Sequence, residues 1–225
     1  SDVSGYTSGG YTGTNAIDKF PFASDGNATS VGILTQARYG VAGQSSTESG
    51  YSSGGHNSNV IDKFPFAADA NATDVGDVLQ IKKYGAGQSS STSGYTSGGL
   101  SPPDLNVIDK FSFASDGNAT DVGDLTIARY INAGQSSSTS GYTAGGYATG
   151  QGTRTTIDKF PFTSDANATF IGNLTQGRYT STGQSSTESG YSSGGSTPTR
   201  VTTIDKFPFT SDTNATDVGD LTQGR

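Results

Sequence analysis

The stretch Ile157-Asp158-Lys159-Phe160-Pro161-Phe162 organises this sequence, because close copies of it occur five times. Each copy leads into a segment Asp-x-Asn-Ala-Thr, and the lysines of successive copies are 44, 47, 49 and 47 residues apart. A period of about 40 to 50 residues is typical of propeller blades or solenoid units. Each hexapeptide therefore marks one structural repeat. The copies begin at Ile17, Ile61, Ile108, Ile157 and Ile204.

The hexapeptide itself has the pattern of a β-strand. Phe160 and Phe162 lie two positions apart, so they share one face of an extended chain. Pro161 faces the other way and cannot donate a hydrogen bond to a neighbouring strand. A proline inside a strand indicates a sheet edge or a bulge, so we expect this strand toward the outer part of each sheet.

The composition favours an all-β fold. The 225 residues include 33 glycines and only 30% hydrophobic residues, mainly Phe, Tyr, Val, Ile and Leu. Aromatic and β-branched residues suit short strands, and Gly, Ser, Asn and Asp suit turns. A Gly- and Ser-rich acidic chain can also be disordered. The fixed register of the aromatic residues argues against that alternative.

Each repeat divides into four pieces of strand length, illustrated by residues 38–46, 49–55, 61–66 and 120–126. The last three pieces occur five times, whereas the first occurs only four times. We therefore predict one domain over residues 1–225, a five-bladed propeller of four-stranded blades in which one blade lacks its first strand. In the alternative, residues beyond 225 complete the ring, and the chain is a fragment or processed form. The repeats are centred near 17–36, 61–81, 108–128, 157–177 and 204–224.

Length variation is confined to one position of the repeat, between a Gly-Gly pair and the hexapeptide. Insertions at one junction place the variable loops on one rim of a repeat protein, and such loops commonly carry binding residues. The expected binding surface is therefore this rim. Its candidate residues are Tyr11, His56, Asn57, Leu100, Tyr147 and Arg154.

An aromatic strand ending in Gly-Gly, a variable loop, an Ile-Asp-Lys-Phe strand and a Gly-Asp-Leu segment together resemble a kelch-type repeat. The chain has no Trp, so it lacks the late Trp of that family and resembles a kelch-like variant. Its near-identical Ser/Thr/Gly-rich units are also similar to repeats of phage and marine-virus structural proteins. The resemblance implies a kelch-like propeller in a virion appendage or fibre, at a virion or extracellular surface. The Gly-Gly pairs begin at Gly9, Gly54, Gly98, Gly145 and Gly194.

Charge and hydropathy exclude several classes of partner. The formal net charge is −7, so the chain lacks the basic face that binds nucleic acid. No apolar run approaches the roughly 20 residues that span a bilayer. The absence of Cys excludes disulfides and thiolate chemistry.

The Asp-x-Asn-Ala-Thr-Asp segments are the strongest candidates for a metal site. Their alternating oxygen ligands could surround calcium, which takes about six to eight oxygens. We favour turns in which Asp and Asn side chains bind nearby amides, and expect no cofactor. The candidate calcium ligands are Asp69, Asn71, Asp74, Asp116, Asn118 and Asp121.

No catalytic group stands out from the repeat. Asp121 and Asp124 could act as a pair of acids in glycoside hydrolysis, but equivalents recur in several repeats, whereas an active site normally breaks symmetry. His56 is the only His and has no identifiable nucleophile beside it. We therefore predict that the protein is not an enzyme.

A basic residue opens the first piece of each unit: Arg38, Lys83, Arg129 and Arg178. One hypothesis is a ring of cations around the channel that binds an anion. The favoured one is an ion pair with an Asp, either of the hexapeptide or of the Gly-Asp-Leu segment.

The sequence thus predicts a non-enzymatic structural or adhesion module, a virion or phage appendage whose rim loops contact a host or partner. The expected partners are a protein or glycan receptor and other virion proteins, with no nucleic acid and no membrane span. The alternatives are a multivalent lectin with sugar sites between blades and a carbohydrate-active enzyme.

Overall fold

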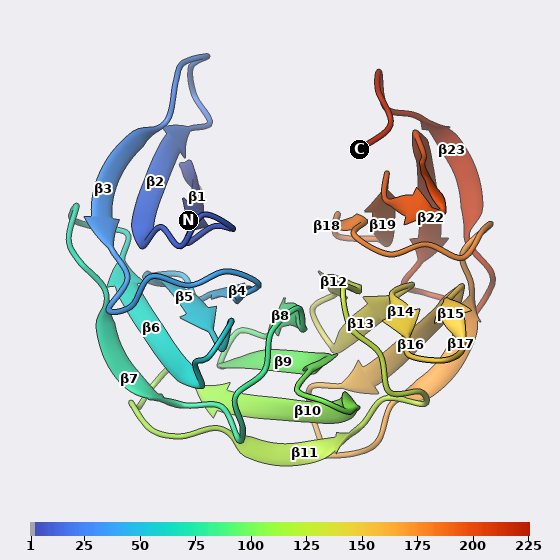
Figure 1. Ribbon diagram of the computed structural model, residues 1–225, viewed down its shortest axis with the longest axis horizontal. Helices are drawn as coiled ribbons and strands as arrows, with labels where there is room; N and C mark the ends of the chain where they lie inside the picture. Colours follow the sequence, from blue (N-terminus) through green and yellow to red (C-terminus); the bar gives the residue numbers. More distant parts are fainter. Residues whose placement is uncertain (1–2) are drawn as a thin grey trace.

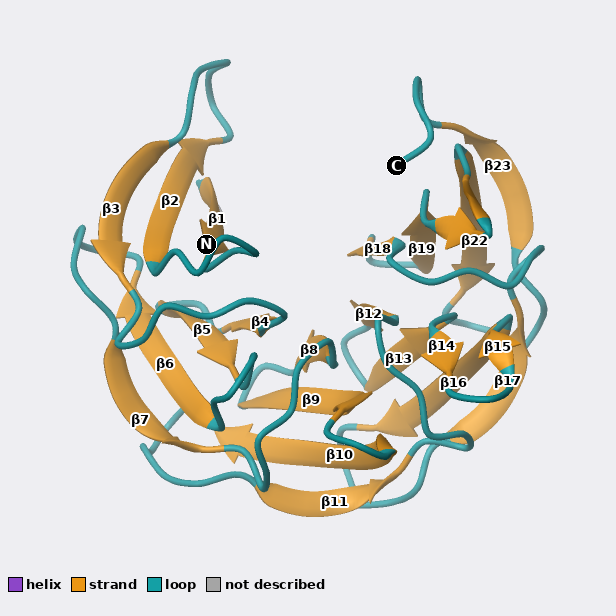
Figure 2. Ribbon diagram, viewed as in Figure 1, coloured by secondary structure: helices purple, strands orange, loops and turns teal. Residues whose placement is uncertain are grey.

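A computed structural model describes residues 3–225, which form strands, turns and loops without a helix. Five antiparallel sheets stand around a common axis like propeller blades (Figures 1 and 2). Four blades have four strands in sequence order from the centre outward, and the first blade has three. The predicted five blades and the missing first strand are thereby confirmed.

The strands divide among the blades as follows. Blade 1 contains β1 (Ser4–Ser8), β2 (Ala16–Pro21) and β3 (Thr29–Ile33). Blade 2 contains β4 (Ala42–Ser45), β5 (Ser49–Ser53), β6 (Val60–Pro65) and β7 (Thr73–Asp77). Blade 3 contains β8 (Ala86–Ser89), β9 (Ser93–Leu100), β10 (Asp104–Ser112) and β11 (Thr120–Asp124). Blade 4 contains β12 (Ala133–Ser136), β13 (Ser140–Ala144), β16 (Thr156–Pro161) and β17 (Thr169–Asn173). Blade 5 contains β18 (Thr182–Ser185), β19 (Ser189–Ser193), β22 (Thr203–Pro208) and β23 (Thr216–Asp220).

Two short ribbons extend from the variable loops of blades 4 and 5. One pairs β14 (Tyr147–Ala148) with β15 (Gly152–Thr153). The other pairs β20 (Ser196–Thr197) with β21 (Thr199–Arg200).

The blades form an open arc. The inner strands β4, β8, β12 and β18 pack against one another in sequence, but blade 1 contributes no strand to this stack within residues 3–225. An opening separates blade 1, at the blue end of the chain, from blade 5, at the red end (Figure 1). Each end of the arc therefore exposes one face of a blade.

The hexapeptide strand is the third of four, in the outer part of the sheet as expected, but it is paired on both sides and is not an edge. In blade 2, β6 pairs with β5 as far as Pro65, but its pairing with β7 ends at Lys63. The proline is tolerated because the outer neighbour has already ended beside it. A register shift does occur in β6, but it lies between Ile61 and Asp62 and not at the proline.

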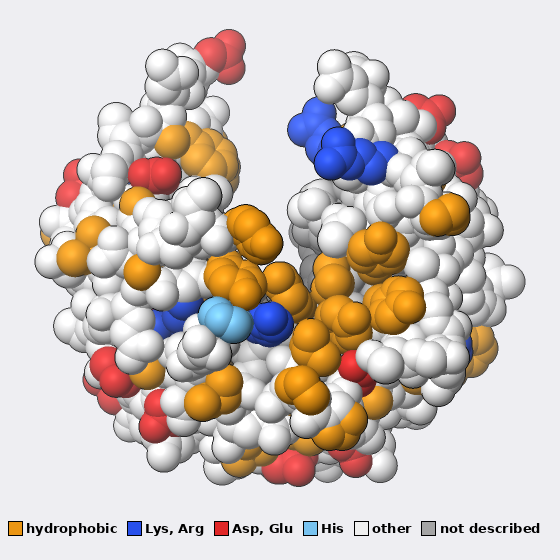
Figure 3. Space-filling view, viewed as in Figure 1, with side chains coloured by type: hydrophobic (Ala, Val, Ile, Leu, Met, Phe, Trp, Pro, Cys, Tyr) orange, Lys and Arg blue, Asp and Glu red, His pale blue; other side chains and the backbone are white. Residues whose placement is uncertain are grey.

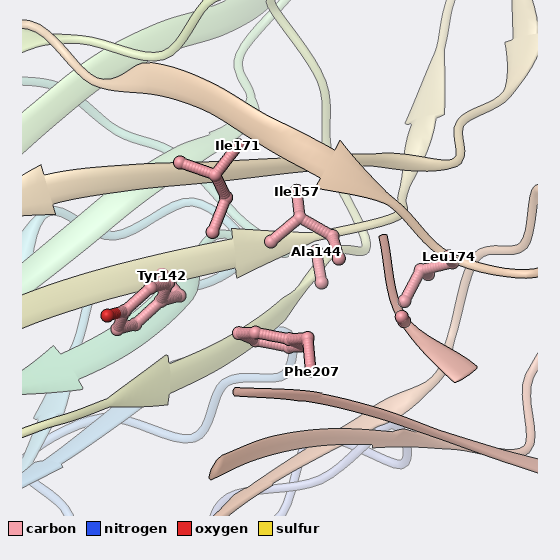
Figure 4. Close-up of a cluster of buried hydrophobic side chains, with 7 residues drawn as sticks. Tyr142, Ala144, Ile157, Ile171, Leu174 and Phe207 are labelled. Atoms are coloured by element: carbon pink, nitrogen blue, oxygen red, sulfur yellow. The ribbon is translucent and has the colours of Figure 1, made fainter. Parts of the chain in front are cut away.

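An aromatic cluster closes each junction between blades, and it explains the Phe pair of the hexapeptide. Tyr51 of blade 2 lies 5.4 Å from Phe111 and 4.8 Å from Phe113 of blade 3, between ring centroids. The same three-ring contact occurs at all four junctions. Figure 4 shows two of these rings at the last junction, where Phe207 packs beside Tyr142 and Ile157. These rings pack with Ile, Leu, Val and Ala side chains to form the apolar core of each junction.

The glycine before each of these tyrosines makes room for the phenylalanine of its own blade. Gly50 lies opposite Phe64 on the neighbouring strand. A Cβ atom on Gly50 would stand 2.3 Å from the Phe64 ring, so only glycine fits. The Ser-Gly-Tyr motif and the Phe of the hexapeptide are therefore two parts of one packing unit.

A buried ion pair crosses each junction as well. The Arg129 guanidinium lies 3.0 Å from the Asp158 carboxylate of the next blade, and both side chains are inaccessible to solvent. Thr126 adds hydrogen bonds to Asp158 from its amide and hydroxyl groups. The four pairs are Arg38–Asp62, Lys82–Asp109, Arg129–Asp158 and Arg178–Asp205.

These contacts confirm the ion-pair hypothesis, and the partner is the Asp of the hexapeptide. The buried guanidinium groups leave no ring of cations for an anion. The assignment of Lys83 to this position was wrong by one residue, because Lys82 makes the pair in blade 3. Lys83 is instead equivalent in the repeat to Tyr39 of the preceding connection.

Candidate binding surface

The variable loops and the connections between blades form one face of the arc, called here the loop face. It comprises the loops between second and third strands and the segments that lead from each outer strand to the next inner strand. Main-chain hydrogen bonds join the two sets, as in His56 N to Tyr39 O at 2.8 Å and Gly55 N to Lys82 O at 2.8 Å. Each variable loop is therefore supported by the connections beside it.

Aromatic side chains follow the inner border of the loop face. At the blade 1 end, Tyr39 lies 5.3 Å from Tyr11, 4.6 Å from the stacked His56 ring and 6.0 Å from Tyr84. Figure 3 shows hydrophobic side chains gathered around the opening on this face, with the histidine and a basic residue among them. Tyr11 is 83% exposed, and Tyr39 and Tyr84 are half-buried, so their rings remain accessible.

A second group of tyrosines continues the border toward blade 5. Tyr147 lies 5.8 Å from Tyr130 and 5.9 Å from Tyr179, both in edge-on arrangements. The two groups together are called the aromatic arc below. They are Tyr11, Tyr39, His56, Tyr84, Tyr130, Tyr147 and Tyr179.

Lys83 places a positive charge within the first group. Its Nζ lies 5.4 Å from the Tyr39 ring centroid, 5.3 Å from that of Tyr84 and 3.5 Å from His56 Nδ1. Burial raises the pKa of Tyr84, and the neighbouring tyrosines add to the rise. Tyr84 is therefore a neutral hydrogen-bonding group beside a cation at neutral pH.

The connections hold a left-handed residue at the same position in four blades. Tyr84, Ile131 and Thr180 have φ values of 62°, 54° and 57°, although glycine, as at Gly40, is the residue that adopts this conformation without strain. Strained positions concentrate at functional sites. The left-handed residue directly follows the arc tyrosine in three connections, and in the connection to blade 3 it is the arc tyrosine Tyr84 itself.

A groove of about 590 Å³ lies beside the second group. Its walls are mainly apolar, and its lining residues include Leu100, Pro102, Pro103, Tyr130 and Gln151. Asp104 is also in the lining, and its carboxylate accepts hydrogen bonds from the amide and hydroxyl groups of Thr149 at 2.6 and 2.8 Å. An apolar groove with a few fixed polar groups is the usual form of a small-ligand site.

A smaller pocket of about 290 Å³ adjoins it across the same loop. It is lined by His56, Asn57, Ile81, Lys83 and Leu100, among others. Since Leu100 and Pro102 border both spaces, a ligand could extend from the cation of Lys83 to the carboxylate of Asp104.

The structure places all six predicted rim residues on the loop face. Tyr11 and His56 belong to the aromatic arc, as does Tyr147, while Asn57 and Leu100 line the smaller pocket. Arg154 lies in the variable loop of blade 4, where its guanidinium donates a hydrogen bond of 3.4 Å to Gln151, a residue of the groove lining.

Sequence reasoning missed Tyr39, Tyr84, Tyr130 and Tyr179, which it assigned to the start of an inner strand. A signal was present, because each follows a basic residue that opens the connection. Asp104 and Thr149 were also missed. They occur once each in unequal loops, so no repeat pattern could identify them.

The predicted calcium ligands take part in turns and junctions. Asp116 pairs with Lys63 of the preceding blade at 3.2 Å, and Asn118 Oδ1 accepts a hydrogen bond from the Asp77 amide at 3.0 Å. Asp121 Oδ1 accepts one from the Gly123 amide at 3.0 Å. The set Asp69, Asn71 and Asp74 makes the corresponding contacts one blade earlier.

No protein-family model matches the chain, and no curated protein matches its sequence. Residues 3–225 contain no helix of the length and hydropathy needed to cross a membrane. Nor do they contain a group of three or more His, Cys, Asp or Glu side chains that could hold a metal ion.

Proposed function

We propose that this protein is a non-enzymatic adhesion module whose loop face binds a carbohydrate. The observation that carries the proposal is the aromatic arc, in which accessible tyrosine rings border an apolar groove that contains a carboxylate and an amide. Aromatic faces pack against the C–H surface of sugars, and fixed polar groups bind their hydroxyls. A propeller fold is compatible with such a binding or structural module.

The composite character of the loop face favours one extended site over several equivalent ones. Asp104 and Thr149 each occur at a single place in loops of unequal length, and Lys83 stands where other connections carry a tyrosine, so the site does not follow the repeat. A lectin with a sugar site between every pair of blades has less support, because Tyr–Phe packing and buried ion pairs fill those junctions. The assignment to a virion or phage appendage rests on the kelch-like and viral resemblance of the repeats.

A glycan array probed with the full chain tests the proposal, followed by titration of the best ligand. Replacing both Tyr39 and Tyr130 with alanine should weaken binding by about tenfold or more, equivalent to roughly 1.4 kcal/mol. Tyr191 is a matched control, since it is a half-buried tyrosine of β19, whose ring contacts Lys206 and lies outside the loop face. Tyr191→Ala should leave affinity unchanged.

Two results would contradict the proposal. One is the absence of glycan binding by the unmodified chain. The other is equal loss of affinity in the Tyr191→Ala variant, which would show that the arc is not the site. Turnover of any bound polysaccharide would replace the adhesion proposal with a carbohydrate-active enzyme.

A further inference from the structure

Blade 1 has an unfilled position at its centre. In the other four blades an inner strand of sequence Ala/Thr-Gly-Gln-Ser pairs with the second strand. In blade 1 the second-strand equivalent is β1, which pairs only with β2 in the part of the chain that the structure describes. The inner edge of β1 thus has no neighbouring strand within residues 3–225.

The glycines of the inner strands show how closely these strands pack. A Cβ atom added to Gly87, Gly134 or Gly183 would stand 2.1, 2.3 or 2.1 Å from the carbonyl oxygen of the equivalent glycine in the preceding blade. A Cβ atom added to Gly43 would meet nothing within 4 Å among the described residues. The space before Gly43 is therefore where the main chain of one more inner strand would lie.

A cavity of about 280 Å³ occupies this place. It lies between β1 and β4, and its lining includes Gly5, Tyr6, Ser8, Gly43, Gln44 and Ser45. It opens along the inner edge of β1. The cavity lies where an inner strand of blade 1 would run, so it suits an extended peptide and not a compact ligand.

Acceptors for a glutamine side chain are already in place beside the cavity. The inner-strand glutamines donate to a tyrosine carbonyl of the next blade, as in Gln44 to Tyr95 at 2.8 Å and Gln88 to Tyr142 at 2.9 Å. The equivalent carbonyl before the cavity belongs to Tyr51.

Hydroxyl groups beside that carbonyl are arranged as at the other junctions. Gln44 also donates to Ser53 and Thr96, whose hydroxyls lie 2.7 Å apart. At the cavity, the equivalent hydroxyls of Ser8 and Ser52 already lie 2.5 Å apart. The hydroxyl pair is therefore formed before any strand arrives.

We propose that the inner edge of β1 binds an extended peptide segment of the type Ala-Gly-Gln-Ser, supplied by a partner polypeptide, as a fourth strand of blade 1. Continuity with the stack of inner strands selects this occupant, because it fixes both register and sequence. The peptide Gln lies opposite Tyr6 and donates to Tyr51 O and to the hydroxyls of Ser8 and Ser52. Main-chain hydrogen bonds to a sheet edge supply affinity, and the glutamine supplies specificity.

A synthetic peptide with the sequence of residues 39–46, blocked at both ends, is the probe. We expect saturable one-to-one binding to the full chain by calorimetry, with slower amide exchange along β1. The same peptide with Leu in place of Gln should bind at least about tenfold more weakly, since it loses a buried hydrogen-bonded group.

A single substitution in the protein provides the matched control. Gly43→Ala should leave the Tm of the free protein unchanged, because the added Cβ meets no described atom. It should abolish peptide binding, because that Cβ occupies the place of the peptide carbonyl. Gly134→Ala, at the same repeat position inside the stack, should lower the Tm.

Three results would overturn the proposal. They are no binding at up to about 1 mM peptide, equal binding of the Gln and Leu peptides, and unchanged binding by the Gly43→Ala variant. Concentration-dependent self-association that Gly43→Ala does not affect would show that the ends of folded copies meet instead.

Discussion

Leu79 stands where three other connections carry a threonine, and replacing it with threonine should stabilise the protein. Thr35, Thr126 and Thr175 each donate a hydroxyl hydrogen bond of 2.7 Å to the buried Asp of the next blade. In blade 3 the corresponding carboxylate is Asp109, which lies 2.8 Å from Lys82 and receives no such hydroxyl.

The magnitude follows from the burial of that carboxylate. Asp109 is 0% exposed, and a hydrogen bond to a charged group contributes about 1.5 to 3 kcal/mol. Leu79 is 49% exposed, so little apolar burial is lost. We expect a gain of roughly 1 to 2 kcal/mol, or about 2 to 6 °C in Tm for a chain of this size.

The gain should also depend on pH. Burial raises the pKa of Asp109, and the charge and hydrogen bonds of Lys82 and the Leu79 amide oppose the rise. A raised carboxyl pKa means that Asp109 contributes stability in acid, which is lost as the pH rises through the folded-state pKa. A hydroxyl that binds the ionised form lowers this pKa. The benefit of Leu79→Thr should therefore be larger at neutral pH than in acid, and it should shrink as the pH falls through the raised folded-state pKa of Asp109.

Urea denaturation followed by far-UV circular dichroism measures the effect at neutral and at acidic pH. Leu79→Val is the control, because valine has the shape of threonine without the hydroxyl. Leu79→Thr made together with Asp109→Asn should show no gain. If Val and Thr stabilise equally, or if the gain persists in acid, the hydrogen bond is not its cause.

Three further predictions concern the junctions and turns. Phe111→Ala should lower the free energy of unfolding, measured in urea, by about 3 to 5 kcal/mol, because Phe111 is only 3% exposed. Phe20→Ala should lower it much less, since Phe20, the equivalent residue at the open end of the arc, is 38% exposed. Asp116→Asn should lower the Tm slightly at low salt but not at about 1 M NaCl, because the ion pair of Asp116 with Lys63 is partly exposed and salt screens it. A decrease in Tm that does not depend on salt would contradict this prediction. EDTA should leave the Tm unchanged, and a rise in Tm on adding calcium would restore the metal hypothesis.

The repeat allowed much of the scaffold to be predicted. The interval between copies of Lys159 gave the number of blades, and the spacing of Phe160 and Phe162 placed both rings on one face. The fourfold occurrence of the first piece indicated the missing strand. These features depend on local pattern and chain order, which the sequence records directly.

Other features depend on geometry between repeats, which no local pattern records. The opening of the arc is a relation between blade 1 and blade 5, which come from opposite ends of the sequence (Figure 1). Lys82, and not the predicted Lys83, pairs with Asp109, because only the side chain directed into the junction can reach that buried carboxylate. The groove requires the unequal loops at Asp104 and Thr149 to meet in space.

The repeated unit carries both halves of the junction, with Tyr and Arg, or Lys at Lys82, on one side and the Phe pair and Asp on the other. Any unit can therefore follow any other without a mismatched interface. Recombination between the near-identical coding repeats could insert or delete a whole unit and still yield matched neighbours. Such a change would alter the number of blades in the arc and the order of the loops along it. The scaffold thus tolerates reshuffling of its surface in steps of one blade.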